Sequence, residues 1–238
     1  MPLNAQGELF GDASLPNGFV YRPDFLDWQD EEFLLAEIRT LPLQAARYRA
    51  FTAKRRIISF GAGYDFETNA PLPAPALPAF LYDIRERAAE WAAIPAGELA
   101  QCTIAAYAPG TQLGWHRDVP TFGIVIGISL AAPCRMRFRR FPHVTHRREQ
   151  LLAIALEPRS IYTLRDQARW RWQHAISPTK ALRYSITFRT MGAHPPPRGG
   201  AGAHPGGRVR RPSGHTQPKT GVGFKSKDAS PKAEGRGR

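Results

Sequence analysis

The segment RYSITFR, residues 183–189, decides how this chain is expected to fold. Successive side chains of a β-strand point to opposite faces, so a strand here has two very different sides. One side carries apolar residues only, namely Tyr184, Ile186 and Phe188. The other side carries two guanidinium groups and two hydroxyl groups, from Arg183, Ser185, Thr187 and Arg189. Because burying such a polar side is costly without a partner, the pattern predicts a strand between an apolar core and a polar cavity.

Five segments upstream also have the composition of short β-strands. They are rich in β-branched or aromatic residues, turn residues bound most of them, and they lie at residues 101–109, 122–130, 134–141, 149–158 and 159–164. With 183–190 they give six strands in about ninety residues, and no helical pattern lies between them. This arrangement predicts an antiparallel sandwich or barrel.

A helix is predicted before the strands, within residues 24–43. Asp27 or Asp30 can cap its N-terminus, and Pro42 ends it. Its buried stripe is formed by Leu34, Ile38 and Leu41.

A second helix is predicted within residues 76–95, where apolar residues recur at helical spacing and Pro95 stops the pattern. Its buried stripe consists of Leu77, Leu81, Ile84, Ala88 and Trp91. The segment between the helices, residues 49–77, is basic, aromatic and too irregular to be a third helix. The predicted fold class is therefore α+β, mainly β, with two helices leading into a double-sheet domain.

The composition of the 238 residues bounds the type of protein. The chain has no run of 18 apolar residues and no basic stretch followed by an apolar run at its start, so neither a membrane span nor a secretory signal is expected. Cys102 and Cys134 are the two cysteines, too few for a disulfide framework or a zinc ribbon. These features predict a cytoplasmic protein with reduced thiols.

The net charge of +13 is concentrated at the C-terminus. Residues 192–238 contain ten Lys or Arg, two acidic residues, eleven Gly and seven Pro. We expect this tail to be disordered, the N-terminal residues 1–17 to be flexible, and residues 18–191 to form the folded domain. The tail is either a basic arm that holds a polyanion or a dispensable solvated extension.

The segment GWHRDVPTFG, residues 114–123, places His116 and Asp118 two positions apart. A protein-kinase catalytic loop is excluded because the position five residues after the aspartate holds Gly123 instead of asparagine. An ordinary surface turn remains possible for the tripeptide alone. At a strand end, however, residues i and i+2 project from one face, so this histidine and carboxylate can reach the same metal ion.

A second histidine would complete a 2-His-1-carboxylate site, which leaves three open positions on Fe(II). His174 begins another β segment and is the preferred third ligand. His143 and His146 compete, but they lie among prolines and arginines in what looks like an exposed connection.

The two arginines of the opening segment suit an anion close to this metal. Their Cα atoms would lie about 20 Å apart along a strand, so inward-leaning side chains leave a gap that fits a small dicarboxylate. An edge strand with solvated arginines would be the simpler interpretation in isolation. The position nine residues after a candidate metal histidine favours the cavity.

The ordered motifs in AAYAPGTQLGWHRD (residues 105–118) and QHAISPTKALRYSITFR (residues 173–189) resemble the AlkB family of Fe(II)- and 2-oxoglutarate-dependent dioxygenases. The resemblance extends over residues 18–191. It implies a double-stranded β-helix (jelly-roll) core with an N-terminal helical layer. It also implies that Fe(II), 2-oxoglutarate and O2 are required, with the iron held by His116, Asp118 and His174.

The resemblance further assigns roles around the iron. Arg183, helped by Tyr107, would bind the distal carboxylate of 2-oxoglutarate, and Arg189 would lie near the proximal carboxylate and the iron-bound aspartate. Ser185 and Thr187 would line the same wall. A nucleotide-recognition lid would fall on residues 49–64, which makes candidate substrate contacts of Lys54, Arg55, Arg56 and Tyr64. The alternative is ordinary surface charge for the three basic residues and a packed side chain for the tyrosine.

Two departures concern the substrate. Ala105 stands where the DNA-repair members commonly carry asparagine, and Val119 and Pro120 stand where they tend to carry a second acid. The expected function is oxidative demethylation of N-alkylated nucleobases in DNA or RNA by a monomer. The alternatives are the same oxygenase chemistry on a protein or small molecule, and a non-catalytic nucleic-acid-binding protein.

Overall fold

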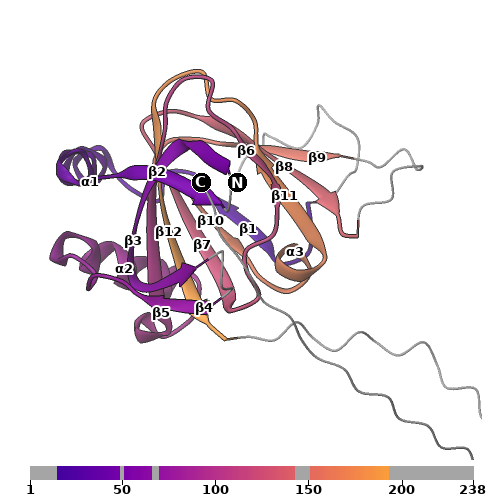
Figure 1. Ribbon diagram of the computed structural model, residues 1–238, viewed down its shortest axis with the longest axis horizontal. Coiled ribbons are helices and arrows are strands. Elements are labelled where there is room, and N and C mark those ends of the chain that lie inside the picture. Colours follow the sequence, from indigo (N-terminus) through magenta and orange to yellow (C-terminus); the bar gives the residue numbers. More distant parts are fainter. Residues whose placement is uncertain (1–14, 49–50, 66–69, 143–150, 193–238) are drawn as a thin grey trace, which may run out of the picture. The chain divides into compact units, whose positions relative to one another are not determined.

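The computed structural model describes residues 15–48, 51–65, 70–142 and 151–192. They form two antiparallel sheets (Figure 1). The larger sheet has the strand order β1 (Phe19–Arg22), β10 (Ile161–Leu164), β7 (Phe122–Leu130), β12 (Arg183–Met191), β5 (Leu99–Tyr107), β3 (Phe51–Asp65) and β2 (Gln44–Tyr48), with β4 (Ala70–Pro73) paired to β3. The smaller sheet has the order β6 (Leu113–His116), β11 (Trp172–Ile176), β8 (Cys134–Arg140) and β9 (Leu152–Leu156).

The helices α1 (Trp28–Thr40) and α2 (Tyr82–Trp91) cover one side of the larger sheet (Figure 1). Two short 3-10 turns, η1 (Ala79–Leu81) and η2 (Ala96–Glu98), flank α2, and α3 (Asp166–Trp170) precedes β11. A capping box starts α1: the Asp27 carboxylate accepts from the Asp30 amide at 2.7 Å, and Asp30 accepts in return from the Asp27 amide. Both predicted helices are therefore present, and each is shorter than the segment in which it was predicted.

The apolar residues of the domain form two cores, one on each side of the larger sheet. The first core lies between α1, α2 and this sheet and includes Ile38, Ile84 and Ile186. The second lies between the two sheets, where Val125 and Tyr162 of the larger sheet meet Phe138 of the smaller one. Two facing antiparallel sheets with a helical layer outside constitute the expected jelly-roll architecture.

The register of β12 determines which of its side chains face the helices and which face the smaller sheet. Tyr184, Ile186 and Phe188 point into the helix-side core, together with the residues of β5 and β7 that pair with them. The alternating residues face the smaller sheet, and they are Arg183, Ser185, Thr187 and Arg189. The central strand thus carries a polar row into the space between the sheets.

The strands in the region 49–77 were not anticipated. β3 pairs with β5 from Arg56↔Ala106 to Gly61↔Gln101 and with β2 on its other edge. Charged residues and Gly61 interrupt the apolar alternation, so the strand depends on pairing with β5 and on Ile58 and Phe60, which pack into the helix-side core.

Several predictions concern residues outside the described ranges. The tail beyond residue 192, most of the N-terminal segment 1–17, and both His143 and His146 belong to this group. Within the described residues, no helix combines the length and apolar character needed to span a membrane.

Candidate metal and co-substrate site

Antiparallel pairing of β6 and β11 brings two histidines together. His116 ends β6, and its Cα partner on β11 is His174. The centroids of their rings are 4.2 Å apart. Asp118 follows two residues after β6, with its Oδ2 atom 3.7 Å from Nε2 of His174. One ligand atom from each of the three residues lies within 4.8 Å of the others, which is the spacing of a shared metal site.

The protonation states of these three groups fit a divalent metal. Burial, together with the neighbouring His116 ring, lowers the pKa of His174 to about 3, and burial also lowers the pKa of His116. Burial opposes ionisation of Asp118, but the charges of Arg189 and its other basic neighbours outweigh it and hold the pKa of this carboxyl well below its usual range. Two neutral imidazoles and one carboxylate are the forms that bind Fe(II).

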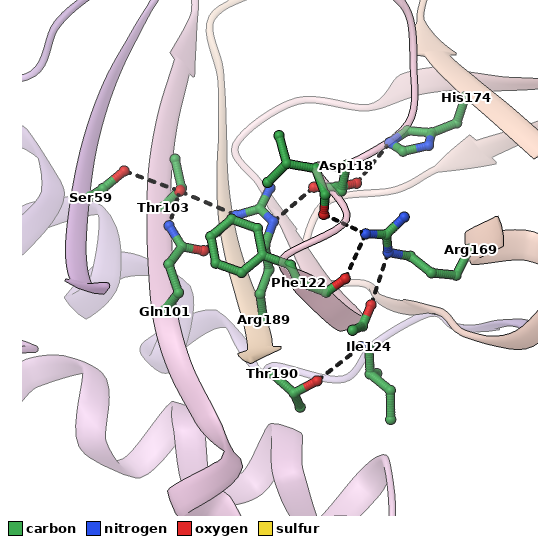
Figure 2. Close-up of polar contacts among 12 residues, drawn as sticks. Ser59, Gln101, Thr103, Asp118, Phe122, Ile124, Arg169, His174, Arg189 and Thr190 are labelled. Atoms are coloured by element: carbon green, nitrogen blue, oxygen red, sulfur yellow. Dashed lines mark hydrogen bonds and ion pairs between the residues drawn. The ribbon is translucent and has the colours of Figure 1, made fainter. Parts of the chain in front are cut away.

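Hydrogen bonds orient two of the three side chains. Nδ1 of His116 lies 2.9 Å from the carbonyl oxygen of Gly114. Because a carbonyl only accepts, this contact favours the tautomer with its proton on Nδ1 and leaves the Nε2 lone pair for a metal. Asp118 accepts at Oδ1 from Nε of Arg189 at 2.8 Å, which leaves Oδ2 facing His174 (Figure 2).

Arg189 is itself held by the larger sheet. Its Nη1 atom donates to Oε1 of Gln101 at 2.8 Å and to Oγ1 of Thr103 at 3.2 Å. Thr103 also lies 3.2 Å from the hydroxyl of Ser59 on β3 (Figure 2). Neighbouring strands therefore fix one guanidinium, which in turn fixes one carboxylate.

Arg183 lies at the other end of the polar row and is 1% exposed. Its Nε atom donates to the hydroxyl of Ser129 at 3.1 Å, and its guanidinium lies 5.0 Å from the centroid of the Tyr107 ring. No acidic side chain among the described residues forms an ion pair with it. A buried cation without a carboxylate partner fits a site for an anionic co-substrate.

Tyr162 of β10 forms part of the wall beside this cation. It passes over Gly127, since a Cβ atom added at that glycine would lie 2.2 Å from Cζ of the tyrosine. Burial raises the pKa of Tyr162, so its hydroxyl remains protonated. Ser185 and Thr187, the other predicted lining residues, stand on the same face as Arg183 by register.

The four predicted substrate contacts differ in where the structure places them on β3. Arg55 shares the site-facing side of β3 with Ser59, and its charge contributes to the lowered pKa of His116. Lys54 and Arg56 are exposed on the alternate side of the strand. Tyr64 pairs with Pro71 through its backbone, and its side chain lies outside the described part of the chain.

Arg169 supports the site without a recognisable motif around it in the sequence. It is 2% exposed and donates to the carbonyl oxygens of Val119 (2.8 Å), Phe122 (2.6 Å) and Gly123 (2.9 Å), all in the segment after Asp118 (Figure 2). Burial lowers its pKa to about 10, so it stays charged at neutral pH. Its position five residues before His174 is the only sequence signal, and many surface arginines share such a position.

Comparison with known proteins identifies the family. The chain matches the 2OG-Fe(II) oxygenase superfamily over residues 31–189 and belongs to it. It is 28% identical over 211 residues to the alkylated DNA repair protein ALKBH8 homolog of Arabidopsis thaliana, which covers 75% of this chain and 59% of that protein. It is 30% identical over 139 residues to the alpha-ketoglutarate-dependent dioxygenase AlkB of Escherichia coli (strain K12), with coverages of 54% and 61%. The chain thus spans about three fifths of these relatives.

Two solved structures share the fold. OsALKBH1 aligns with a TM-score of 0.58 at 16% identity, covering 74% of this chain and 100% of that one. A prolyl-4-hydroxylase of Pseudomonas putida aligns with a TM-score of 0.53 at 14% identity, covering 74% and 93%. These likenesses confirm the jelly-roll fold. Family membership confirms the predicted class, an AlkB-like 2-oxoglutarate-dependent dioxygenase, and its cofactors Fe(II), 2-oxoglutarate and O2.

Proposed function

We propose that this protein oxidatively removes alkyl groups from N-alkylated nucleobases in DNA or RNA. The observation that carries this proposal is the meeting of His116, Asp118 and His174 in one cluster, together with a buried Arg183 that has no acidic partner among the described residues. Relatives named for alkylated DNA repair and for AlkB support the nucleobase as substrate.

In this proposal the three clustered residues hold Fe(II), and Arg183 with Tyr107 binds the distal carboxylate of 2-oxoglutarate. Together these groups supply an O2-dependent hydroxylation of a C–H bond, with conversion of 2-oxoglutarate to succinate and CO2. On an N-methyl group the hydroxylated product then releases formaldehyde and leaves the free amine.

The described side chains contribute orientation and charge. Arg189 keeps Asp118 ionised and turned toward His174, and Arg169 fixes the segment that follows Asp118. Burial of His174 would limit the access of water to a metal held by this cluster. A base within a duplex would have to be flipped out to reach this cluster.

The choice among nucleobases rests on fewer residues. Arg55 is the predicted contact residue that faces the site, while Ala105 and Pro120 offer no hydrogen-bonding side chain at the positions where repair members carry asparagine or an acid. We therefore propose contacts with the phosphates from the basic β3 region and stacking of the base on an aromatic residue such as Tyr64.

We also propose residues 18–191 as the catalytic domain of a monomeric, cytoplasmic protein, with the basic tail 192–238 as an appendage. The free, buried thiols of Cys102 and Cys134 are consistent with a reducing compartment.

The test is product release from matched substrates. Full-length protein with Fe(II) and 2-oxoglutarate is incubated with oligonucleotides containing 1-methyladenine or 3-methylcytosine, with the same unmethylated oligonucleotides, with RNA and with protein extracts. We expect formaldehyde in proportion to succinate with the methylated oligonucleotides, and none with Asp118→Ala. Turnover stimulated by protein alone would replace this proposal with a protein substrate.

A further inference from the structure

The outer face of the smaller sheet carries a set of basic and aromatic side chains that the catalytic site does not use. On β8, Met136 and Phe138 point into the core between the sheets, so the alternate residues point outward. On β6, Trp115 points away from the site that His116 lines. We call this surface the arginine–tryptophan face, and it consists of Trp115, Arg135, Arg137, Arg139 and Gln173.

Tryptophan and arginine are stacked on this face. The guanidinium carbons of Arg137 and Arg139 lie 5.1 and 4.7 Å from the centroid of the Trp115 ring. Arg139 also donates from Nε to Oε1 of Gln173 at 2.7 Å. These contacts pre-order the side chains, while the outer N–H groups of the guanidiniums remain available for an anion.

The row of arginines on this face, Arg135, Arg137 and Arg139, lacks an acidic ion-pair partner within the part of the chain that the structure describes. Small residues flank the row on both neighbouring strands, since Arg135 pairs with Ala155, and Arg137 lies between Ala153 and Ala175. Arg135 is exposed and Arg137 and Arg139 are half-buried, and successive arginines lie about 6.6 Å apart along the strand.

We propose that the arginine–tryptophan face binds the backbone and a base of single-stranded nucleic acid outside the catalytic pocket. A row of three arginines beside a half-buried tryptophan ring offers the two groups that such a surface needs, cations for phosphate contacts and an aromatic ring for a base. This inference deepens the proposed function and rests on it for the identity of the anion.

The arginine–tryptophan face and the candidate metal site share the strand β6. β6 is the edge strand of the smaller sheet, and it carries His116 on its inner side and Trp115 on its outer side. A strand of nucleic acid bound across the outer face can therefore pass around this edge toward the metal site. The face would hold nucleotides adjacent in the chain to the one that reacts.

The first test measures how binding of an unmodified single-stranded DNA oligonucleotide to the full-length protein depends on salt. We expect the double variant Arg137→Gln/Arg139→Gln to bind more weakly and to lower the slope of log K against log salt by about 1.4, which is two contacts of about 0.7 each. The matched control Arg22→Gln/Arg39→Gln removes the same charge from exposed positions near and on α1. Equal slopes in both double variants would overturn the proposal.

The second test addresses stacking. Trp115→Ala should weaken oligonucleotide binding by roughly 5- to 150-fold, the range expected for loss of one stacked base, and Trp115→Phe should recover most of it. Binding of the oligonucleotide should also quench the tryptophan fluorescence of the wild type. The part of this quenching that comes from Trp115 should be missing in Trp115→Phe. Melting temperatures of all variants check that the sheet is intact, and unchanged affinity in a folded Trp115→Ala would contradict stacking.

The outcomes separate this inference from the proposed function. Oligonucleotide binding that depends on the face, without release of formaldehyde, would leave the inference standing and reject demethylation. If Arg137→Gln/Arg139→Gln demethylates oligonucleotides as efficiently as the wild type, nucleic-acid binding by the face is rejected and the proposed function stands. Binding of polyglutamate or anionic vesicles through these arginines in place of oligonucleotide would show that the partner is a different polyanion.

Discussion

Arg189 donates a hydrogen bond to Asp118 across 2.8 Å, although the two residues are 71 positions apart in the chain. The guanidinium belongs to β12 of the larger sheet, and the carboxylate follows β6 of the smaller one. This contact joins the two sheets at the candidate metal site and gives the carboxylate one orientation.

Replacement of Arg189 by methionine should weaken metal binding. Without the guanidinium, Oδ1 of Asp118 loses its donor, and the buried carboxylate loses its nearest compensating charge. Loss of such a supporting contact typically costs 10- to 100-fold in affinity, and we expect about that for Mn(II) measured by electron paramagnetic resonance. Arg171→Met, at an exposed position, is the control. Equal affinities in the two variants would show that Arg189 does not support the ligand.

Replacement of Arg183 by methionine should weaken the binding of 2-oxoglutarate and leave the binding of the metal unchanged. The variant removes a buried cation that has no carboxylate partner among the described residues, so we expect about 100-fold weaker 2-oxoglutarate binding, equivalent to about 3 kcal/mol. Ser129→Ala removes only the hydrogen bond to its Nε and should weaken binding far less. Isothermal titration with each ligand provides the measurement. An equal loss of metal affinity would indicate general unfolding of the site.

Arg169→Met should loosen the segment that follows Asp118. Three carbonyl oxygens, two of them in buried contacts, lose their donor, so we expect unfolding to become easier by about 3 kcal/mol and amide exchange to accelerate over residues 119–123. Arg165→Met is a useful comparison because that arginine contacts the distant carbonyl oxygen of Ala92. Acceleration of exchange at the same segment in both variants would contradict a local role for Arg169.

Glu31→Gln should destabilise the helical layer. Glu31 is 4% exposed, pairs with Arg159 at 3.0 Å, and accepts from the amide of Ala131 in the turn after β7. Removing one partner of a buried pair costs about 3 kcal/mol. Glu32→Gln, the exposed neighbour, should change the free energy of unfolding by less than about 0.5 kcal/mol in the same urea titration. Similar losses in the two variants would mean that the pair is not a specific support.

The sequence predicts the central strand and the two helices because their patterns are local. Alternation over residues 183–189 matches the register of β12, and Asp27 and Pro42 mark the ends of α1 in the structure as in the sequence. The pair of candidate ligands His116 and Asp118 can also be recognised from the local sequence. His174 was preferred over two other histidines, and pairing of β11 with β6 places it opposite His116.

The missed features depend on contacts distant in sequence. β3 is a strand because it pairs with β2 and β5, and its own charged and glycine residues give no alternating pattern. Nothing near Arg169 shows that its guanidinium reaches the carbonyl oxygens of a segment 46 to 50 positions earlier. Of three neighbouring basic residues proposed to contact substrate, the pleat of β3 sends only Arg55 toward the site.

The most direct test of the central claim is an anaerobic titration of the protein with Fe(II) and 2-oxoglutarate. If His116, Asp118 and His174 hold one iron, the wild type develops a weak visible metal-to-ligand charge-transfer band that saturates at one equivalent, and His174→Ala lacks this band. His143→Ala, which changes the rival histidine, retains it. A band that persists in His174→Ala, or that disappears in His143→Ala, would contradict the proposed iron site.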